Sequence, residues 1–226
     1  MKRILITLFF FAHAFAVAQE EAPNSKILLR FASFGVKDNG AEYTVAAADG
    51  QTAAFKIPNN GFSPPIATPV KGRTFALGLA GSAPFKSLAA IKLPAVGKRF
   101  IILMFPKKQG LRAVVIRADD PGFRPGQVMI MNLAQETFFA ELGEKKMRFE
   151  PSSRTIFRPQ RKGDLANYQV RFFMNKNGKQ KMFAANLWPY FENKRAFVFI
   201  FKDPTTGHPN YRAIDEFTSW LKEGSE

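Results

Sequence analysis

Apolar residues recur at every second position along most of the chain, and Gly, Pro or Asn interrupts them every six to ten residues. The stretch 126–159 shows this most clearly: Val128 to Leu133 is apolar, and Thr137 to Leu142 and Lys146 to Glu150 alternate. This period is typical of antiparallel strands that bury one face and expose the other. We therefore expect 126–159 to form a meander within one sheet of a β-sandwich.

The same pattern predicts strands throughout the chain, and two of them should be central. Phe100 to Phe105 and Arg195 to Lys202 are apolar at almost every position, as expected where both faces of a strand are buried. Asp49-Gly50 and Asn177-Gly178 each separate two alternating runs, and such pairs favour the type I′ turns of β-hairpins. About seven strands precede residue 118, which is the usual number for a small sandwich.

The strongest break lies at residues 119–126, where two Pro and two Gly fall within six residues. We predict an all-β fold of antiparallel β-sandwiches, with two immunoglobulin-like halves in tandem and a short C-terminal helix or tail. One larger sandwich or barrel is the alternative, because no residue-level repeat is apparent between the halves. The expected segments are 1–18 (signal peptide), 26–118 and 126–215 (sandwich domains) and 216–226 (tail).

The first eighteen residues have the pattern of a secretory signal peptide. Lys2 and Arg3 precede the apolar segment Ile4 to Phe15, and Ala16-Val17-Ala18 is a small-residue cleavage site. The apolar segment is shorter than the ~20 residues of a membrane-spanning helix. We expect cleavage after Ala18, no transmembrane span in the mature chain, and a periplasmic or secreted location. The chain has no cysteine, which excludes disulfides and thiolate sites.

The chain is strongly basic, with a formal net charge of +15. Lys2 and Arg3 account for two of these charges, so the mature chain carries +13. This excess favours an anionic partner, although it also serves to keep an apolar β protein in solution. In an envelope compartment the candidates are lipopolysaccharide, anionic lipid or acidic glycan. Nucleic acid is not expected, because the chain is exported and lacks an RNA-binding aromatic signature.

Between Lys145 and Lys181 there are eleven basic residues and only two acidic ones. We expect their side chains to form one basic sheet face that binds phosphate or carboxylate groups. A solvated face whose lysines prevent edge-to-edge aggregation is the alternative. The candidate binding residues are Lys145, Lys146, Arg148, Arg154, Arg158, Arg171, Lys179 and Lys181, and Arg161, Lys162 and Lys176 belong to the same stretch.

Three aromatic residues lie close together at Trp188-Pro189-Tyr190-Phe191, in a segment that we predict to be a loop. Exposed aromatic rings stack on sugar rings or bases, so Trp188 and Tyr190 are further candidate binding residues. The alternative is that these rings close one end of the sandwich or pack between the halves.

Groups for catalysis or metal binding are scarce. His208 is the only histidine of the mature chain, whereas zinc sites need three or four clustered ligands. Asp119-Asp120 lacks the acidic spacing of a calcium loop, and Asp215-Glu216 is interpreted as a charge pair at a helix N-terminus. We predict no catalytic residue, no metal and no cofactor.

The sequence thus favours a non-catalytic binding or scaffolding protein of the bacterial envelope that contacts an anionic component through the basic face. A structural or assembly subunit, with its Phe-rich edges as the interface to a protein partner, is the second hypothesis. A glycan-active hydrolase using Glu192 and Asp164 is the third. The pattern resembles that of exported bacterial β-sandwich modules, and this resemblance assigns no site residue.

Overall fold

The computed structural model describes residues 26–36, 40–48, 50–68, 72–160, 167–203 and 205–222. Within these ranges the chain forms sixteen β-strands and one short 3₁₀ helix, η1 (Thr218–Leu221). This confirms the all-β fold and the short C-terminal helix. Several sequence predictions fall outside the described residues: the signal peptide 1–18, Asp49 of the first hairpin turn, and Arg161, Lys162 and Asp164.

The strands form four sheets of four strands each. Sheet A contains, in order, β4 (Ile66–Ala67), β1 (Leu28–Ser33), β7 (Arg99–Pro106) and β8 (Leu111–Arg117). Sheet B contains β3 (Gly50–Gln51), β2 (Tyr43–Ala47), β5 (Thr74–Leu79) and β6 (Ser87–Lys92). Sheet C contains β12 (Arg154–Phe157), β9 (Val128–Asn132), β15 (Lys194–Lys202) and β16 (Pro209–Phe217). Sheet D contains β11 (Lys145–Phe149), β10 (Phe138–Leu142), β13 (Asn167–Lys176) and β14 (Lys179–Pro189).

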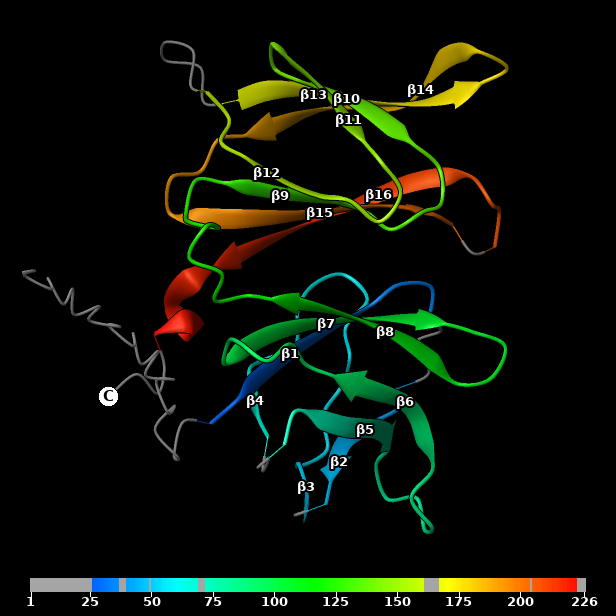
Figure 1. The fold of residues 1–226 in the computed structure, drawn as a ribbon, viewed down its shortest axis with the longest axis vertical. Helices are drawn as coiled ribbons and strands as arrows, with labels where there is room; N and C mark the ends of the chain where they lie inside the picture. Colours follow the sequence, from blue (N-terminus) through cyan, green and yellow to red (C-terminus); the bar gives the residue numbers. More distant parts are fainter. Residues whose placement is uncertain are drawn as a thin grey trace, which may run out of the picture.

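The four sheets stack as layers in the order B, A, C, D (Figure 1). One apolar core lies between sheets A and B, and another lies between sheets C and D. A third core joins sheet A to sheet C and therefore joins the first half of the chain to the second. The ring of Phe34 in the first half meets the ring of Phe199 edge-on, with 5.3 Å between the ring centroids, and the centroids of Phe123 and Phe197 are 5.0 Å apart.

This layering explains the two strands without a polar face. Sheets A and C each pack on both sides, so β7 and β15 have neighbours on both faces. Along β7, for example, Phe100 and Ile102 enter the core with sheet B, whereas Ile101 and Leu103 enter the core with sheet C. The prediction that β7 and β15 are central strands is confirmed.

The predicted meander 126–159 is wrong as a single sheet. Strands β9 and β12 pair in sheet C, whereas β10 and β11 pair in sheet D, so the chain crosses to the other sheet and returns. Asn132 ties these crossings together, because its buried side-chain amide lies 2.7–3.1 Å from three carbonyl oxygens at the ends of β11 and before β10. Alternation identifies the residues that face a core, but both sheets face the same core.

Each half repeats the same topology. Adding eight to every strand number converts the order of sheet A into that of sheet C, and the order of sheet B into that of sheet D. Both halves contain one parallel pair, β1 with β7 and β9 with β15, which the sequence pattern did not indicate. The register shift between β5 and β6 follows Leu77, and the shift between β13 and β14 follows the equivalent Phe172. The fold is thus a tandem of two sandwich halves, and the domain boundary at 119–125 stays a prediction.

A residue-level repeat becomes visible once the strands are aligned. Lys98-Arg99 and Lys194-Arg195 occupy equivalent positions at the start of the two central strands. The two arginines cross the interface in opposite directions: Arg99 Nε donates to the carbonyl of Trp220 (3.1 Å), and Arg195 Nη1 donates to the carbonyl of Ala118 (2.8 Å). The two halves therefore pack through equivalent residues on equivalent strands.

Candidate functional site

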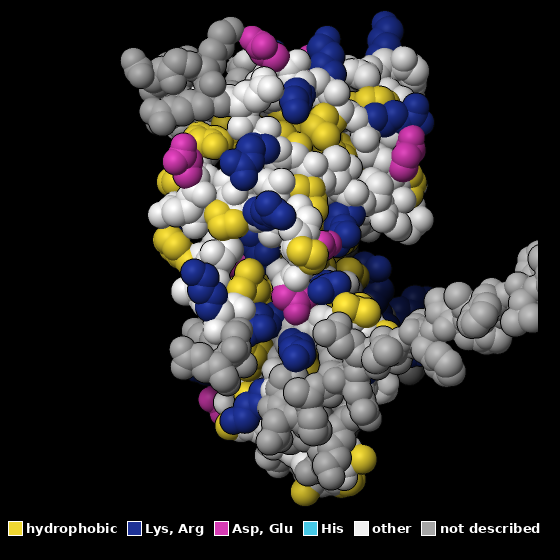
Figure 2. Space-filling view, turned by 60° about the vertical axis from the view of Figure 1, so that its left-hand side comes forward, with side chains coloured by type: hydrophobic (Ala, Val, Ile, Leu, Met, Phe, Trp, Pro, Cys, Tyr) yellow, Lys and Arg dark blue, Asp and Glu magenta, His cyan; other side chains and the backbone are white. Residues whose placement is uncertain are grey.

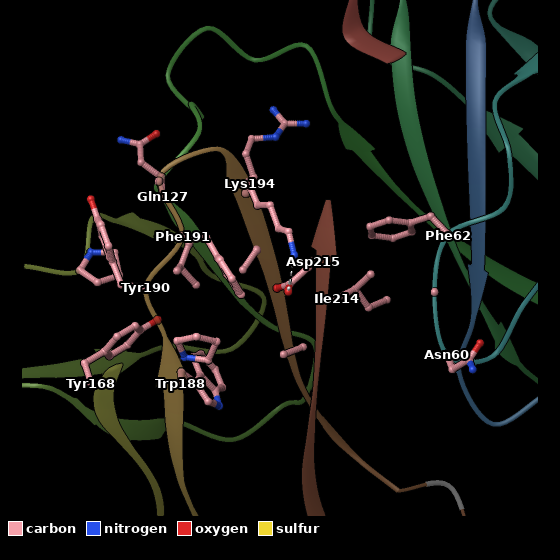
Figure 3. Close-up of a pocket in the computed structure, with 18 residues that line it drawn as sticks. Asn60, Phe62, Gln127, Tyr168, Trp188, Tyr190, Phe191, Lys194, Ile214 and Asp215 are labelled. Atoms are coloured by element: carbon pink, nitrogen blue, oxygen red, sulfur yellow. Dashed lines mark ion pairs between the residues drawn. The ribbon is translucent and has the colours of Figure 1, made fainter. Parts of the chain in front are cut away.

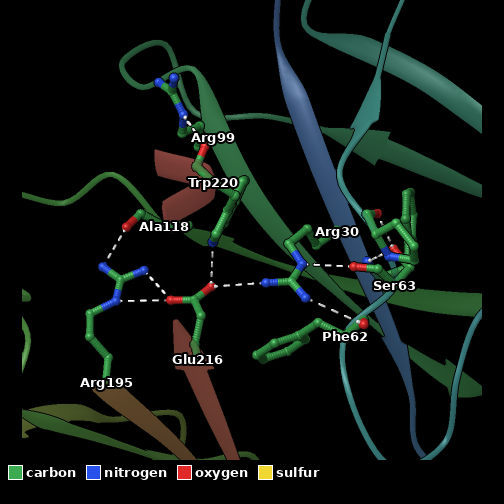
Figure 4. A network of polar contacts seen from close by, with 10 residues as sticks. Arg30, Phe62, Ser63, Arg99, Ala118, Arg195, Glu216 and Trp220 are labelled. Carbon is green, nitrogen blue, oxygen red and sulfur yellow. Dashed lines mark hydrogen bonds and ion pairs between the residues drawn. The ribbon is translucent and has the colours of Figure 1, made fainter. Parts of the chain in front are cut away.

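A buried polar network lies at this interface, next to the candidate site (Figure 4). Glu216 lies at its centre and accepts hydrogen bonds from Arg195 Nε and Trp220 Nε1, both at 2.9 Å. Arg30 of the first half lies 3.7 Å from Glu216 and donates to the carbonyl of Ser63 (2.7 Å). The side chains of Arg195 and Glu216 are 1% and 0% exposed, so both charges depend on these partners.

The interpretation of Asp215-Glu216 as a helix N-terminal pair is wrong. Both residues lie on β16, and η1 begins after them, at Thr218. Because neighbouring strand residues point to opposite faces, Glu216 faces the interface network and Asp215 faces the other way. Asp215 thereby enters a cleft between the halves that the sequence did not reveal.

This aromatic cleft has a volume of about 370 Å³, within the ~300–1,000 Å³ range of small-molecule sites. Four rings of the second half gather on one side, and Asn60 and Phe62 of the first half lie opposite (Figure 3). The four rings belong to Tyr168, Trp188, Tyr190 and Phe191.

Trp188 is not a loop residue, because β14 extends to Pro189. Its half-buried ring packs between Tyr168 and Tyr211, with centroids at 6.2 and 5.8 Å, at the end of the core of the second half. The prediction that these aromatics close the sandwich is therefore confirmed for Trp188. The same ring also forms part of the cleft wall, so one side chain serves both the core and the cleft.

Charges in the cleft are arranged around Lys194. Its ammonium lies 4.1 Å from the ring centroid of Phe191, 4.7 Å from that of Phe217, and 3.9 Å from the carboxylate of Asp215. Burial, together with the nearby charge of Asp215, raises the pKa of Tyr168 far above its ordinary value. The phenol of Tyr168 therefore stays protonated and available as a hydrogen-bond donor.

A second cavity of about 360 Å³ adjoins the cleft and shares two of its wall residues, Pro159 and Tyr168. The cations Lys145 and Arg158 line this basic pocket, together with the acid Glu144. Its remaining polar walls are the amide side chains of Gln160, Asn167 and Gln169. The aromatic cleft and the basic pocket share a wall at Pro159 and Tyr168, and we refer to the two cavities together as the groove. Four of the predicted binding residues line it: Lys145, Arg158, Trp188 and Tyr190.

The other predicted cations do not share a face with these four. Lys146, Arg148 and Arg171 occupy outward positions of sheet D, and Arg154 pairs with Asp120 at 3.2 Å. Lys176, Lys179 and Lys181 lie on the β13–β14 hairpin, on the opposite side of the strands. Lysine and arginine are accordingly spread from one end of the molecule to the other on the face in Figure 2, with acidic residues among them.

Other groups singled out in the sequence lie outside the groove. Asp119 accepts from the backbone N–H of Lys98 (2.7 Å), and Asp120 accepts from that of Gly122 (2.9 Å). His208 is exposed in the turn before β16. Glu192 is exposed and lines neither cavity of the groove.

Within the described ranges, no cluster of three His, Cys, Asp or Glu could hold a metal ion. No helix among these residues is long and apolar enough to cross a membrane.

Comparison with known proteins adds no assignment: no protein-family model matches the chain, and no curated protein matches it significantly. The sequence did indicate Trp188 and Tyr190, because three aromatics within four residues are unusual. Lys194 also follows this aromatic segment closely in the sequence. Nothing in the sequence indicated that Phe62 and Asp215 join it in one cleft, because these residues come from separate strands and loops that meet only in the fold.

Proposed function

We propose that this chain is exported, loses residues 1–18, and acts as a non-catalytic binding protein for an acidic glycan of the bacterial envelope. The observation that carries this proposal is the groove, in which an aromatic cleft shares a wall with a pocket that contains two cations. Sugar rings stack on aromatic side chains, and their carboxylate or sulfate groups pair with Lys and Arg. Of the anionic components considered, an acidic glycan presents the C–H faces of sugar rings and charged groups in alternation along its whole length.

The carboxylates of the groove support binding over hydrolysis. Among the described residues, Asp215 is the only acid lining the aromatic cleft, where Lys194 holds it in an ion pair, and Glu144 lines the adjoining basic pocket. A hydrolase needs two carboxyl groups on either side of the bond that is broken. Glu192, which the hydrolase hypothesis required, lies outside the groove, and Asp164 is not among the described residues.

The assembly-subunit hypothesis receives less support from the surface. It requires phenylalanines at exposed edges, whereas most phenylalanines of the described chain lie in the three cores. Phe191 and Phe217 are the only phenylalanines among the described large hydrophobic residues with high exposure.

The proposal is tested by calorimetric titration of the mature protein with heparin-derived oligosaccharides and with neutral cello-oligosaccharides. We expect binding of the acidic probe that weakens steeply above ~0.3 M salt, because the Debye length becomes short. Trp188→Ala and Tyr190→Ala should each weaken binding about tenfold, the value of one lost stacking contact. No binding of the acidic probe at low salt would contradict the proposal.

Two charge variants locate the site. Lys145→Gln/Arg158→Gln removes the cations of the basic pocket and should weaken binding at least tenfold. Lys179→Gln/Lys181→Gln removes the same charge from the hairpin, outside the groove, and should weaken binding less than threefold. Equal losses for the two variants would show that general surface charge, and not the groove, holds the glycan. Arg158 Nη2 also donates to the carbonyl of Pro125, so circular dichroism should confirm that the variant is folded.

A further inference from the structure

The outward face of sheet D is the end layer of the molecule, and no other described element covers it (Figure 1). Strand pairing lines its outward side chains up in rows that cross all four strands. The first row is mainly apolar and consists of Arg148, Phe139, Phe173 and Met182. The second row is mainly charged and consists of Lys146, Glu141, Arg171 and Ala185. Gln169 and Leu187 form a third, shorter row.

Large apolar side chains on this face are exposed to solvent. Leu187 is 65% exposed and Met182 is 49% exposed. Phe139 and Phe173 are partly buried in the row of Met182, and the exposed Ala185 lies between Met182 and Leu187 along β14. Polar residues normally occupy the outward face of a sheet that packs on one side only. Contiguous exposed apolar side chains generally mark a contact surface.

Cations stand directly beside this apolar surface. The guanidinium of Arg148 lies 5.9 Å from the ring centroid of Phe139 and pairs with Glu150 at 2.6 Å. Lys146 and Arg171 flank Glu141 at 3.7 and 3.2 Å. The two longer rows thus hold three cations and one acid, which leaves the face positive.

The first half of the chain covers the equivalent row with one of its own side chains. Sheet B is equivalent to sheet D, and Thr44 and Gly78 stand where sheet D has Phe139 and Phe173. A Cβ at Gly78 would lie 2.5 Å from the ring of Phe85, and Thr44 is only 3% exposed, so this part of sheet B is covered within the chain. In sheet D the row has bulky apolar side chains and no described element covers it, so we look for a covering partner outside the chain.

We infer that the outward face of sheet D docks on an anionic lipid bilayer. Met182 and Leu187 enter the boundary between headgroups and acyl chains, and Lys146, Arg148 and Arg171 contact lipid phosphates. A bilayer suits this face because none of these five residues lines the aromatic cleft or the basic pocket, and because a mainly apolar row and a mainly charged row lie side by side across the four strands. Of the residues in the three rows, only Gln169 also lines the basic pocket, so the bilayer contacts of the other residues are separate from the proposed glycan binding.

Flotation of the mature protein with vesicles tests the inference. We expect partitioning onto vesicles of phosphatidylglycerol and phosphatidylcholine, and little onto phosphatidylcholine alone. Met182→Ser/Leu187→Ser should reduce partitioning about tenfold or more, because the inserted apolar groups are lost. Lys146→Gln/Arg148→Gln should reduce it about fivefold for each cation removed, and Glu141→Gln should increase it by a similar factor.

Matched variants away from this face serve as controls. Val96→Ser removes a 58% exposed apolar side chain of the first half, and Lys92→Gln removes a cation from the outward side of sheet B. Neither should change partitioning more than twofold. Absence of binding to the anionic vesicles, or equal losses for control and test variants, would overturn the inference. Unchanged partitioning of Met182→Ser/Leu187→Ser in a folded protein would also overturn it, because charge alone would then explain binding.

Discussion

Glu216→Gln should cause a large loss of stability although it leaves the volume of the side chain almost unchanged. The carboxylate is fully buried, accepts two hydrogen bonds from Arg195, and also accepts from Trp220 Nε1 (2.9 Å). Glutamine keeps the volume but leaves the buried Arg195 guanidinium without a counter-charge. Breaking a buried ion pair in this way costs about 3–5 kcal/mol, a large fraction of the ~5–15 kcal/mol that stabilises a typical domain.

The assay is urea denaturation of the mature protein, followed by Trp220 fluorescence in a Trp188→Phe background and by far-ultraviolet circular dichroism. Trp220 lies in the interface core, so its fluorescence reports separation of the halves. We expect both signals to shift together to lower urea, because the interface couples the two halves. Glu136→Gln, which breaks the half-exposed pair with Lys202, is the control and should change stability by at most ~1 kcal/mol. A loss below ~1 kcal/mol for Glu216→Gln would refute the reasoning.

Three further predictions concern single residues. Burial raises the pKa of Tyr168, so its phenol remains protonated in the folded protein. The stability that depends on this protonation is present below the ordinary pKa of 10.0 and is lost at higher pH. Denaturation between about pH 9 and about pH 11 should therefore show Tyr168→Phe gaining stability relative to the parent. Asn132→Ala should cost about 2 kcal/mol or more in urea denaturation, because buried carbonyls lose their donor. Thermal denaturation should show that Gly110→Ala lowers the melting temperature more than Gly178→Ala does. Both glycines have positive φ, but a methyl group at Gly110 would lie 2.4 Å from a backbone carbonyl oxygen, whereas a methyl group at Gly178 would meet no neighbouring atom.

Local features of this fold could be predicted from the sequence because they depend on neighbouring residues. The Asn177-Gly178 hairpin is one example: both residues adopt positive φ (52° and 74°), as a type I′ turn requires. The two central strands are another, because burial on both faces leaves no polar position. Both predictions rest on properties that a short segment carries by itself.

The assignment of strands to sheets could not be predicted in the same way. Strand β9 is apolar at four of its five positions and β10 alternates, because β9 lies in a sheet covered on both faces and β10 in a sheet covered on one. This difference indicates how many faces are covered but not which strands pair, and the crossing between the sheets is stabilised by Asn132. Glu216 was misinterpreted for a related reason: an acidic residue shortly before a short helix looks the same whether the preceding residues are strand or loop. Its partners Arg30 and Arg195 are distant in sequence, so nothing local indicated a buried charge.

Comparing equivalent positions of the two halves distinguishes residues that the shared fold requires from residues that only one half contains. Positions that keep their character in both halves, such as Arg99 and Arg195, serve the packing of sheet A on sheet C. Positions that differ between equivalent sites, such as Thr44 and Phe139, are not required by the shared architecture. Both the groove and the outward face of sheet D draw mainly on the second half, which contains the whole basic stretch from Lys145 to Lys181. The first half contributes one wall of the cleft and the other side of the interface. We therefore expect the contacts with a ligand to come mainly from the second half, and the geometry of the cleft to depend on both halves.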